Sequence, residues 1–413
     1  MTIIDPAVLL KVLSKGDEGE EGERVELGTR LESFIYTDDE KKADILKLKI
    51  DNKDLSQFDN GIWERGQVLN VAWGYVNALT TVRSVVIKKA SGYPTLEVEA
   101  HAKSVLMDKE IKSRVFEDMS HSEIVKEIAE ENGYKGNRAI IDDTKVKIRQ
   151  VNQAGLTDAQ FLKHLANREG FEFYVDFDGL HWHERKLDQR PVRVFTYYND
   201  PVRNEILAFQ PDGDITKRPT RVKLQGRDPL KKQDIDVEAS NEDTNNRAAL
   251  GDVMEAIDLK TGESLGDRMK NTSHDETLPT TETDEDAAKR VADGRFKRAA
   301  LNTIKVKITV IGDPDVVAKT VIELRGLGKK FSGKYYVSSV ESKIEGGFLM
   351  DLNCKRDGSG LGTGISGTSG VPSAGKKNNQ EASENDVEPI EKINLKTGES
   401  KGVEFRDTKG RSN

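Results

Sequence analysis

The stretch TDAQFLKHLANREGFEFYVDFDGLHWHER, residues 157–185, decides the fold. Thr157 and Gln160 stand three residues apart, as the two members of a helix-capping box do. The apolar residues that follow recur at helical spacing, and Gly170 can end the helix in the left-handed backbone conformation. Two short alternating runs then flank an Asp-Gly turn pair at 178–179. This stretch therefore predicts a helix followed by a β-hairpin.

A second helix is predicted just upstream. Ser120 and Glu123 form another capping box, an apolar stripe follows, and Gly133 is a plausible stop. We therefore expect residues 106–190 to form a small α+β domain.

The sequence on both sides of this domain indicates strands. Short runs alternate apolar and polar residues and are separated by turn signals, which is typical of antiparallel barrels. The runs lie at 30–36, 44–50, 68–73, 82–88, 96–100, 192–197, 221–224, 304–310, 320–324, 334–344 and 348–354. We predict a first β-barrel in residues 1–105 and a second in residues 191–238 and 301–356.

The two predicted barrels look like copies of one another. With Val82 set against Val337, several residues of the two hairpins coincide, and one slip later Leu96–Ala100 meets Met350–Cys354. Before each block lies a similar strand that ends in glycine, Val68–Gly74 and Val321–Gly326. Chance likeness between two hairpins is the alternative. A duplicated β-domain would let three subunits imitate a six-membered ring.

Two further segments are expected to be flexible. Residues 239–286 are polar and acidic, so they cannot offset their ordering entropy by burial, and we predict a mobile loop. A helix is predicted at 284–300, which makes 239–300 an acidic insert with a helix. Residues 357–413 are expected to be a Gly/Ser linker followed by a polar tail.

Composition excludes several classes of function. The chain has 413 residues with 64 basic and 72 acidic side chains, a net charge of −8, which disfavours binding along a nucleic-acid backbone. No stretch approaches the roughly 18–20 apolar residues of a membrane anchor. The first residues lack a basic secretory leader, and the single Cys354 forbids an internal disulfide.

Few residues suggest chemistry. His181 and His183 are expected on one face of a strand, with Glu184 adjacent. This spacing is typical of metal ligands, but the sequence places no third ligand. The simpler interpretation is a solvated strand face opposite Trp182. His121, at a helix start, is also expected in solvent. Cys354 is expected to be buried, and no catalytic motif is present, so we expect no catalytic residue, metal or cofactor.

Residues 157–185 resemble the helix-plus-hairpin signature of phage late control protein D. That family includes baseplate hub proteins of contractile tails and the N-terminal part of VgrG spikes. Leu46–Tyr75 is similar to the family's first barrel, and Gly312–Gly358 is similar to the end of its second. The resemblance implies an α+β, mainly β fold, with two related antiparallel β-barrels, an inserted small α+β domain and a mobile acidic insert.

The resemblance also implies a structural role. Three copies would form a pseudo-sixfold ring that adapts a hexameric tail tube to a threefold spike. The expected partners are two further copies of the chain, the tail tube protein, a central spike protein and other baseplate proteins. The expected location is the tail baseplate of a virion or an injection particle, assembled in the bacterial cytoplasm. After Lys355 the sequence has no room for a spike, so we expect the hub alone.

The strands next to the two glycines are our candidates for the ring wall. The candidate residues are Val71, Trp73, Tyr75, Val321 and Leu324. An alternative of a different class is a tail-associated peptidoglycan hydrolase that uses the 106–190 domain with His181, His183 and Glu184. Turnover of peptidoglycan distinguishes the two hypotheses.

Overall fold

The computed structural model describes residues 6–13, 23–25, 27–59, 61–176, 178–198, 204–213, 221–227, 232–240, 275–280, 285–357, 387–393 and 400–407. The chain divides into two units, Met1–Ile365 and Ser366–Asn413. The predicted mobile loop lies largely outside the described residues, and so does most of the predicted linker.

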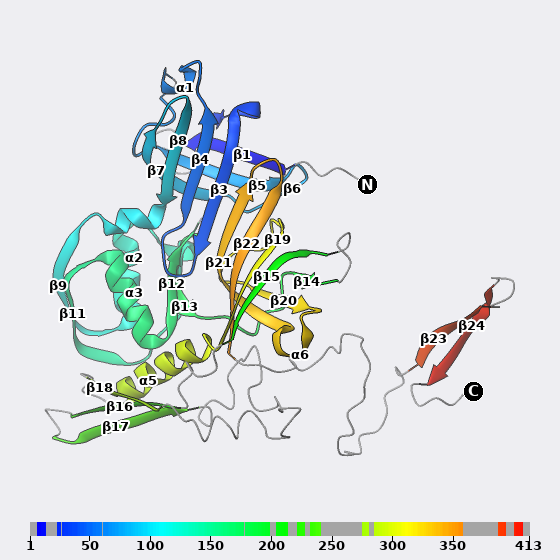
Figure 1. Ribbon diagram of the computed structural model, residues 1–413. Coiled ribbons are helices and arrows are strands. Elements are labelled where there is room, and N and C mark those ends of the chain that lie inside the picture. Colours follow the sequence, from blue (N-terminus) through cyan, green and yellow to red (C-terminus); the bar gives the residue numbers. More distant parts are fainter. Residues whose placement is uncertain are drawn as a thin grey trace. The chain divides into compact units, whose positions relative to one another are not determined.

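A large sheet of 14 strands forms the frame of the first unit (Figure 1). Its strands are β1 (Pro6–Leu13), β2 (Glu23–Val25), β3 (Leu31–Asp39), β4 (Ile45–Asp51), β5 (Val68–Tyr75), β6 (Ala78–Leu79), β7 (Arg83–Ser91), β8 (Thr95–Ala102), β14 (Val194–Thr196), β15 (Ile206–Gly213), β19 (Ile304–Ile311), β20 (Val321–Arg325), β21 (Gly333–Ile344) and β22 (Phe348–Arg356). The main path runs β15-β19-β22-β21-β3-β4-β8-β7-β5-β1-β2, with β14, β20 and β6 attached beside it. Three short helices accompany it, η1 (Gly28–Arg30), α1 (Ser56–Asp59) and α6 (Gly328–Phe331).

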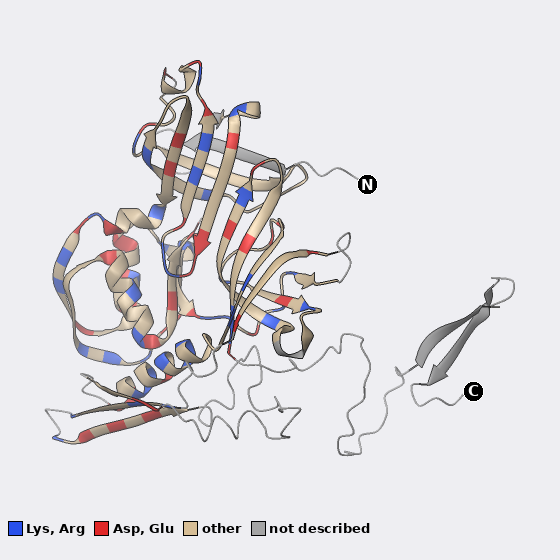
Figure 2. Ribbon diagram, viewed as in Figure 1, with Lys and Arg blue, Asp and Glu red and all other residues tan. Residues whose placement is uncertain are grey.

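Alternation along the strands builds the core of this sheet. In β4, Leu46 and Leu48 are buried while Lys47 and Lys49 are exposed, because successive side chains of a strand point to opposite faces. Figure 2 shows basic residues along β4 and acidic residues along β8. There Lys49 lies 3.8 Å from Glu97 of β8. The alternating runs predicted as strands in this sheet are confirmed.

The sheet contains one five-strand arrangement twice. In the first half, β3, β4, β5, β7 and β8 lie in the spatial order β3-β4-β8-β7-β5. In the second half, β15, β19, β20, β21 and β22 lie in the order β15-β19-β22-β21-β20. All these pairs are antiparallel, and the order along the chain is the same. The topology therefore repeats.

Irregularities of the strands repeat as well. The β3·β4 and β15·β19 pairs are each interrupted at the second residue of the first strand, at Glu32 and at Leu207. The β7·β8 and β21·β22 pairs are each interrupted at one residue, Lys88 and Ser338. A β-bulge bends a strand at a defined place. Matching bulges at matching places support a duplicated β-domain.

The backbone before β5 and before β20 also matches. Gly66 and Lys319 have φ of +89° and +69°, and each donates its N–H over 2.8 Å to a carbonyl, of Ile87 and Val337 respectively. Val337 therefore corresponds to Ile87 and not to Val82, which corrects our alignment of the hairpins by five residues. The sequence could not show this shift, because period-2 strands match at several registers.

The end of the second hairpin returns to the first half. Residues Ser339–Ile344 of β21 pair antiparallel with Phe34–Asp39 of β3, from Ser339 opposite Asp39 to Ile344 opposite Phe34. The two halves are therefore one continuous curled sheet (Figure 1). The predicted fold class is confirmed as α+β and mainly β, with antiparallel strands.

A small α+β part follows the first half. It contains η2 (Lys103–Asp108), β9 (Ile111–Ser120), α2 (His121–Glu131), η3 (Gly136–Arg138), β10 (Ala139–Ile141), β11 (Lys147–Thr157), α3 (Asp158–Glu169), β12 (Phe171–Val175) and β13 (Leu180–Glu184). Both predicted capping boxes are present, at Ser120 and at Thr157. The long β9·β11 pair was not predicted.

A third sheet differs from our expectation. The strands β16 (Arg221–Arg227) and β17 (Asp234–Ser240), which we assigned to the second barrel, pair with each other and with β18 (Asp275–Pro279). Their apolar faces pack on helix α5 (Glu285–Ala300), through Val222 and Val237 against Ala292 and Phe296. The prediction of a loop was therefore wrong for 275–279. The predicted boundaries of the domains remain predictions.

Helix α5 also touches α3 through two glycines. A Cβ built on Gly170 would lie 2.8 Å from the Cα of Gly294. Gly170 ends α3 with a φ of +76°, so it serves both as a left-handed cap and as a close contact.

The second unit contains one described hairpin. Its strands β23 (Val387–Ile393) and β24 (Ser400–Asp407) pair antiparallel, where we expected only a polar tail. Among the described residues, no helix has the length and apolar character that crossing a membrane requires.

Candidate functional site

Charged groups gather where the two halves of the sheet and the small α+β part meet. Asp38 lies near the end of β3, and Lys319 precedes β20; the Lys319 Nζ lies 2.5 Å from Asp38 Oδ1. The N–H of Ala318 donates to the other carboxylate oxygen over 3.1 Å. Burial works against charge on Asp38, but Lys319 and then Arg83 lower the pKa of its carboxyl. The pair holds the first half against the second.

A neighbouring carboxyl behaves in the opposite way. Asp44 accepts a hydrogen bond from the Tyr36 hydroxyl over 2.9 Å. Burial, followed by the negative charge of Asp38, raises the pKa of Asp44 to about 7. This carboxyl therefore changes its protonation near neutral pH.

The β12–β13 hairpin supplies the third side of this junction. The Tyr174 ring stacks on the His181 ring, with centroids 4.4 Å apart. The Lys319 Nζ lies over the same Tyr174 ring, 4.7 Å from its centroid. His181 Nε2 lies 2.9 Å from Asp176 Oδ1. His183 Nδ1 donates to the carbonyl of Glu184 over 2.8 Å.

Our expectation of a solvated histidine face was wrong. His181 and His183 are only 8% and 3% exposed, and their face of β13 lines a small pocket of about 260 Å³ at the junction. The other face is buried as well, since Trp182 packs in the α+β core and donates its Nε1–H to the carbonyl of Leu162 over 3.3 Å. His121 is also buried, and its Nδ1 lies 2.5 Å from Glu169 Oε1.

The residues of the hydrolase hypothesis are not brought together. Glu184 is exposed on the opposite side of β13 from the two histidines, and it accepts from Lys297 Nζ over 2.6 Å. Among the described residues, no group of three His, Cys, Asp or Glu side chains is arranged to hold a metal ion.

Further charges bind the hairpin to β21 and β22. The Tyr336 hydroxyl donates to Glu172 Oε2 over 2.8 Å, and Arg185 Nε lies 3.8 Å from the same oxygen. Lys355 forms an ion pair with Glu40 in the turn after β3. No local sequence pattern indicates this network, because its residues lie far from their partners along the chain.

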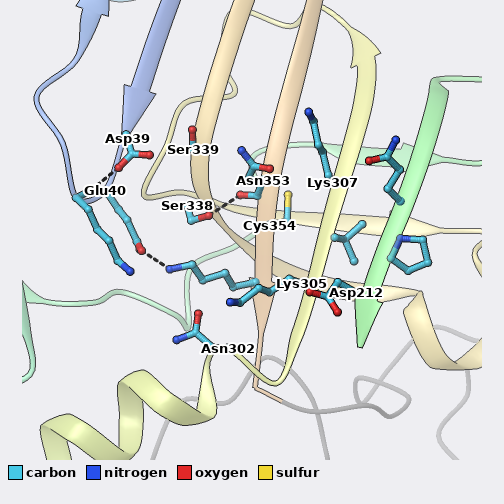
Figure 3. Close-up of a pocket in the computed structure, with 15 residues that line it drawn as sticks. Asp39, Glu40, Asp212, Asn302, Lys305, Lys307, Ser338, Ser339, Asn353 and Cys354 are labelled. Carbon is cyan, nitrogen blue, oxygen red and sulfur yellow. Dashed lines mark hydrogen bonds and ion pairs between the residues drawn. The ribbon is translucent and has the colours of Figure 1, made fainter. Parts of the chain in front are cut away.

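A polar pocket of about 610 Å³ lies over β19, β22 and the end of β15 (Figure 3). Lysines and acids line it together, among them Lys305, Lys307 and Asp212. Ser338 donates to the carbonyl of Asn353 over 2.8 Å at its wall. Cys354 is buried, as predicted, and burial raises the pKa of its thiol, so it is a poor nucleophile.

Four of the five candidate ring-wall residues lie in the core of the large sheet. Val71, Trp73, Val321 and Leu324 are buried. Tyr75 is partly buried, and its hydroxyl donates to the carbonyl of Gly312 over 2.8 Å, which links β5 to the second half. Their part in a ring stays a prediction.

Several solved structures share the fold, including two tail proteins and one secretion-system component. A tail protein from Neisseria meningitidis MC58 has a TM-score of 0.59 and 14% identity, covering 85% of this chain and 97% of that chain. The 43 kDa tail protein of prophage MuSo2 from Shewanella oneidensis has a TM-score of 0.59 and 12% identity, covering 86% and 99%. A type VI secretion system component from E. coli, described as similar to the T4 bacteriophage tail proteins gp27 and gp5, has a TM-score of 0.50 and 10% identity, covering 84% and 76%.

The chain therefore has the fold of phage tail and baseplate proteins, as the resemblance implied. The family model described as the Alg8 N-terminal domain matches residues 44–346, and the chain belongs to this family. No curated protein matches the sequence.

Proposed function

We propose that this protein is a structural baseplate hub of a contractile phage tail or a related injection particle. Three copies form a ring with pseudo-sixfold symmetry, which joins a hexameric tail tube on one side to a threefold central spike on the other. The tail tube protein, the spike and other baseplate proteins are the proposed partners. The particle is assembled in the bacterial cytoplasm.

The repeated five-strand arrangement is the observation that supports this proposal. Each chain carries the order β3-β4-β8-β7-β5 and its copy β15-β19-β22-β21-β20, so three chains carry six similar units. Oligomers of one chain favour closed symmetry, and a head-to-tail contact between unlike halves closes after three subunits. Such a ring presents six similar surfaces to a hexamer and three identical ones to a spike.

The alternative of a peptidoglycan hydrolase has little support. The carboxylate of Glu184 and the rings of His181 and His183 lie on opposite sides of β13. A general acid or base needs hydrogen-bond reach to its substrate, whereas both histidines are almost fully buried at the wall of a small pocket of about 260 Å³. We propose that the chain is not an enzyme.

Light scattering on the purified full-length chain tests the proposal. We expect a mass three times the 46.0 kDa of one chain. A single-chain mass at every concentration, a dimer, or turnover of purified peptidoglycan would contradict it.

A further inference from the structure

Within the repeated five-strand arrangement, β15 and the end of β7 each have a strand edge without a partner among the described residues. β15 pairs with β19 on one side only. The last residues of β7, Lys89–Ser91, pair with β8 on one side only, because β5 pairs with β7 no further than Val86 and the Ile87 backbone. Unpaired strand edges are templates for pairing with another chain.

The corresponding edges of the other half are paired with each other. β3 corresponds to β15, and the end of β21 corresponds to the end of β7. Within one chain, β3 and β21 form six residue pairs. The unpaired edges of β15 and of the end of β7 are therefore the ones that would form the equivalent of the β3·β21 pair between two copies of the chain.

We propose that β15 of one copy pairs antiparallel with the end of β7 of a second copy, in the register that β3 and β21 use. This inference rests on the proposed ring. Because Glu341 faces Thr37 within the chain, the repeat sets Ser91 of one copy opposite Asp212 of the next. Ala90 then lies opposite Gly213.

Charge agrees with this register. Lys89 and Ser91 share one face of β7, so Lys89 becomes the diagonal neighbour of Asp212, at a distance that a long side chain spans. Both Lys89 and Asp212 are exposed in the single chain. The pairing is also expected to end at Ser91, which is the last residue of β7. The next pair would set Gly92 opposite Pro211, which has no N–H to donate.

Apolar exposure favours the same surface. Leu207 is 51% exposed at the start of β15, and Ile311 and Leu349 beside it are exposed too. Their counterparts in the first half, where the edge is covered, are polar: Glu32, Asp51 and Thr95. The turn after β7 carries Tyr93, which is 64% exposed. In the proposed register, Tyr93 of one copy follows Ser91 toward the start of β15 of the next copy, where this apolar patch lies.

Disulfide cross-linking tests the register, because the only native cysteine, Cys354, is buried. The double variant Ser91→Cys with Asp212→Cys places two thiols at directly opposed positions, within the reach of a disulfide. We expect mild oxidation to join copies into covalent trimers. The control variant Ser91→Cys with Leu207→Cys shifts one thiol by five residues, roughly 16 Å along the strand, and should not cross-link.

Light scattering on the same reduced variants separates the two proposals. A trimer whose Ser91 and Asp212 cysteines do not cross-link, or one in which the control pair cross-links as well, would overturn this strand pairing and leave the ring intact. A single-chain mass for the unmodified protein would overturn the ring itself.

Discussion

Gly66 and Lys319 occupy the same position in the two halves of the sheet, and both have left-handed backbone. Glycine adopts this conformation freely, whereas a lysine there is strained by about 1 kcal/mol or more. In this strained backbone conformation, the ammonium of Lys319 forms an ion pair with the buried carboxylate of Asp38. One copy of the repeat therefore has a neutral turn at this position, whereas the other has a charged contact to its neighbour.

The first prediction concerns this contact. Lys319→Gly relieves the backbone but removes the ammonium paired with the buried Asp38, a loss of roughly 3–5 kcal/mol that outweighs the gain. We expect lower stability in urea unfolding. Gly66→Ala is the control for strain without charge, since nothing lies within 4 Å of its new Cβ, and it should cost only about 1 kcal/mol. Equal stability of Lys319→Gly and the unmodified chain would refute the importance of the pair.

The second prediction concerns pH. The pKa of Asp44 rises from an ordinary 3.8 to about 7 in the folded chain. The folded state therefore binds this proton more tightly than the unfolded state, and the free energy of unfolding falls as pH rises from about 4 to about 7, by up to ~1.4 kcal/mol per unit.

The variant Asp44→Asn tests that dependence. Its amide oxygen can still accept from Tyr36, but it cannot titrate. The variant should be the more stable protein at pH 8, and its advantage should shrink as pH falls toward 4. Parallel stability curves for the two proteins across this range would show that Asp44 does not titrate as described.

The third prediction concerns the buried histidines. His181→Ala with His183→Ala removes the stacking on Tyr174 and the hydrogen bonds to Asp176 and the Glu184 carbonyl. We expect a loss of about 2–4 kcal/mol in the free energy of unfolding. Glu184→Ala, at an exposed side chain, should cost less than about 1 kcal/mol. A stable double variant would restore the idea of a solvated face.

The fourth prediction concerns the packing of α5 on α3. Gly294→Ala puts a methyl 2.9 Å from the Gly170 backbone and should cost about 1–3 kcal/mol, because neither backbone can move freely. Gly294 lies inside α5 and has no positive φ, so its substitution reports the clash, whereas Gly133→Ala, with a φ of +85° and open space around it, reports backbone strain without a clash. Thermal unfolding of both variants distinguishes the two costs; a Gly294→Ala protein that is as stable as the unmodified chain would rule out the tight contact.

Local signals explain what the sequence could predict. Capping boxes at Ser120 and Thr157 and the period-2 strands fix elements through neighbouring residues, so both helices and most strands were predicted. The separate sheet of β16 and β17 depends on their packing against α5, which lies more than forty residues later. The junction around Asp38 and Lys319 joins residues 281 positions apart, so no local pattern reveals it.

The symmetry of the assembled ring tests the central claim most directly. Class averages of the isolated hub, or of particles that contain it, should show threefold order, with six similar densities at the level of the sheet that β3–β8 and β15–β22 form. A dimer, or a ring of six whole subunits, would contradict the account.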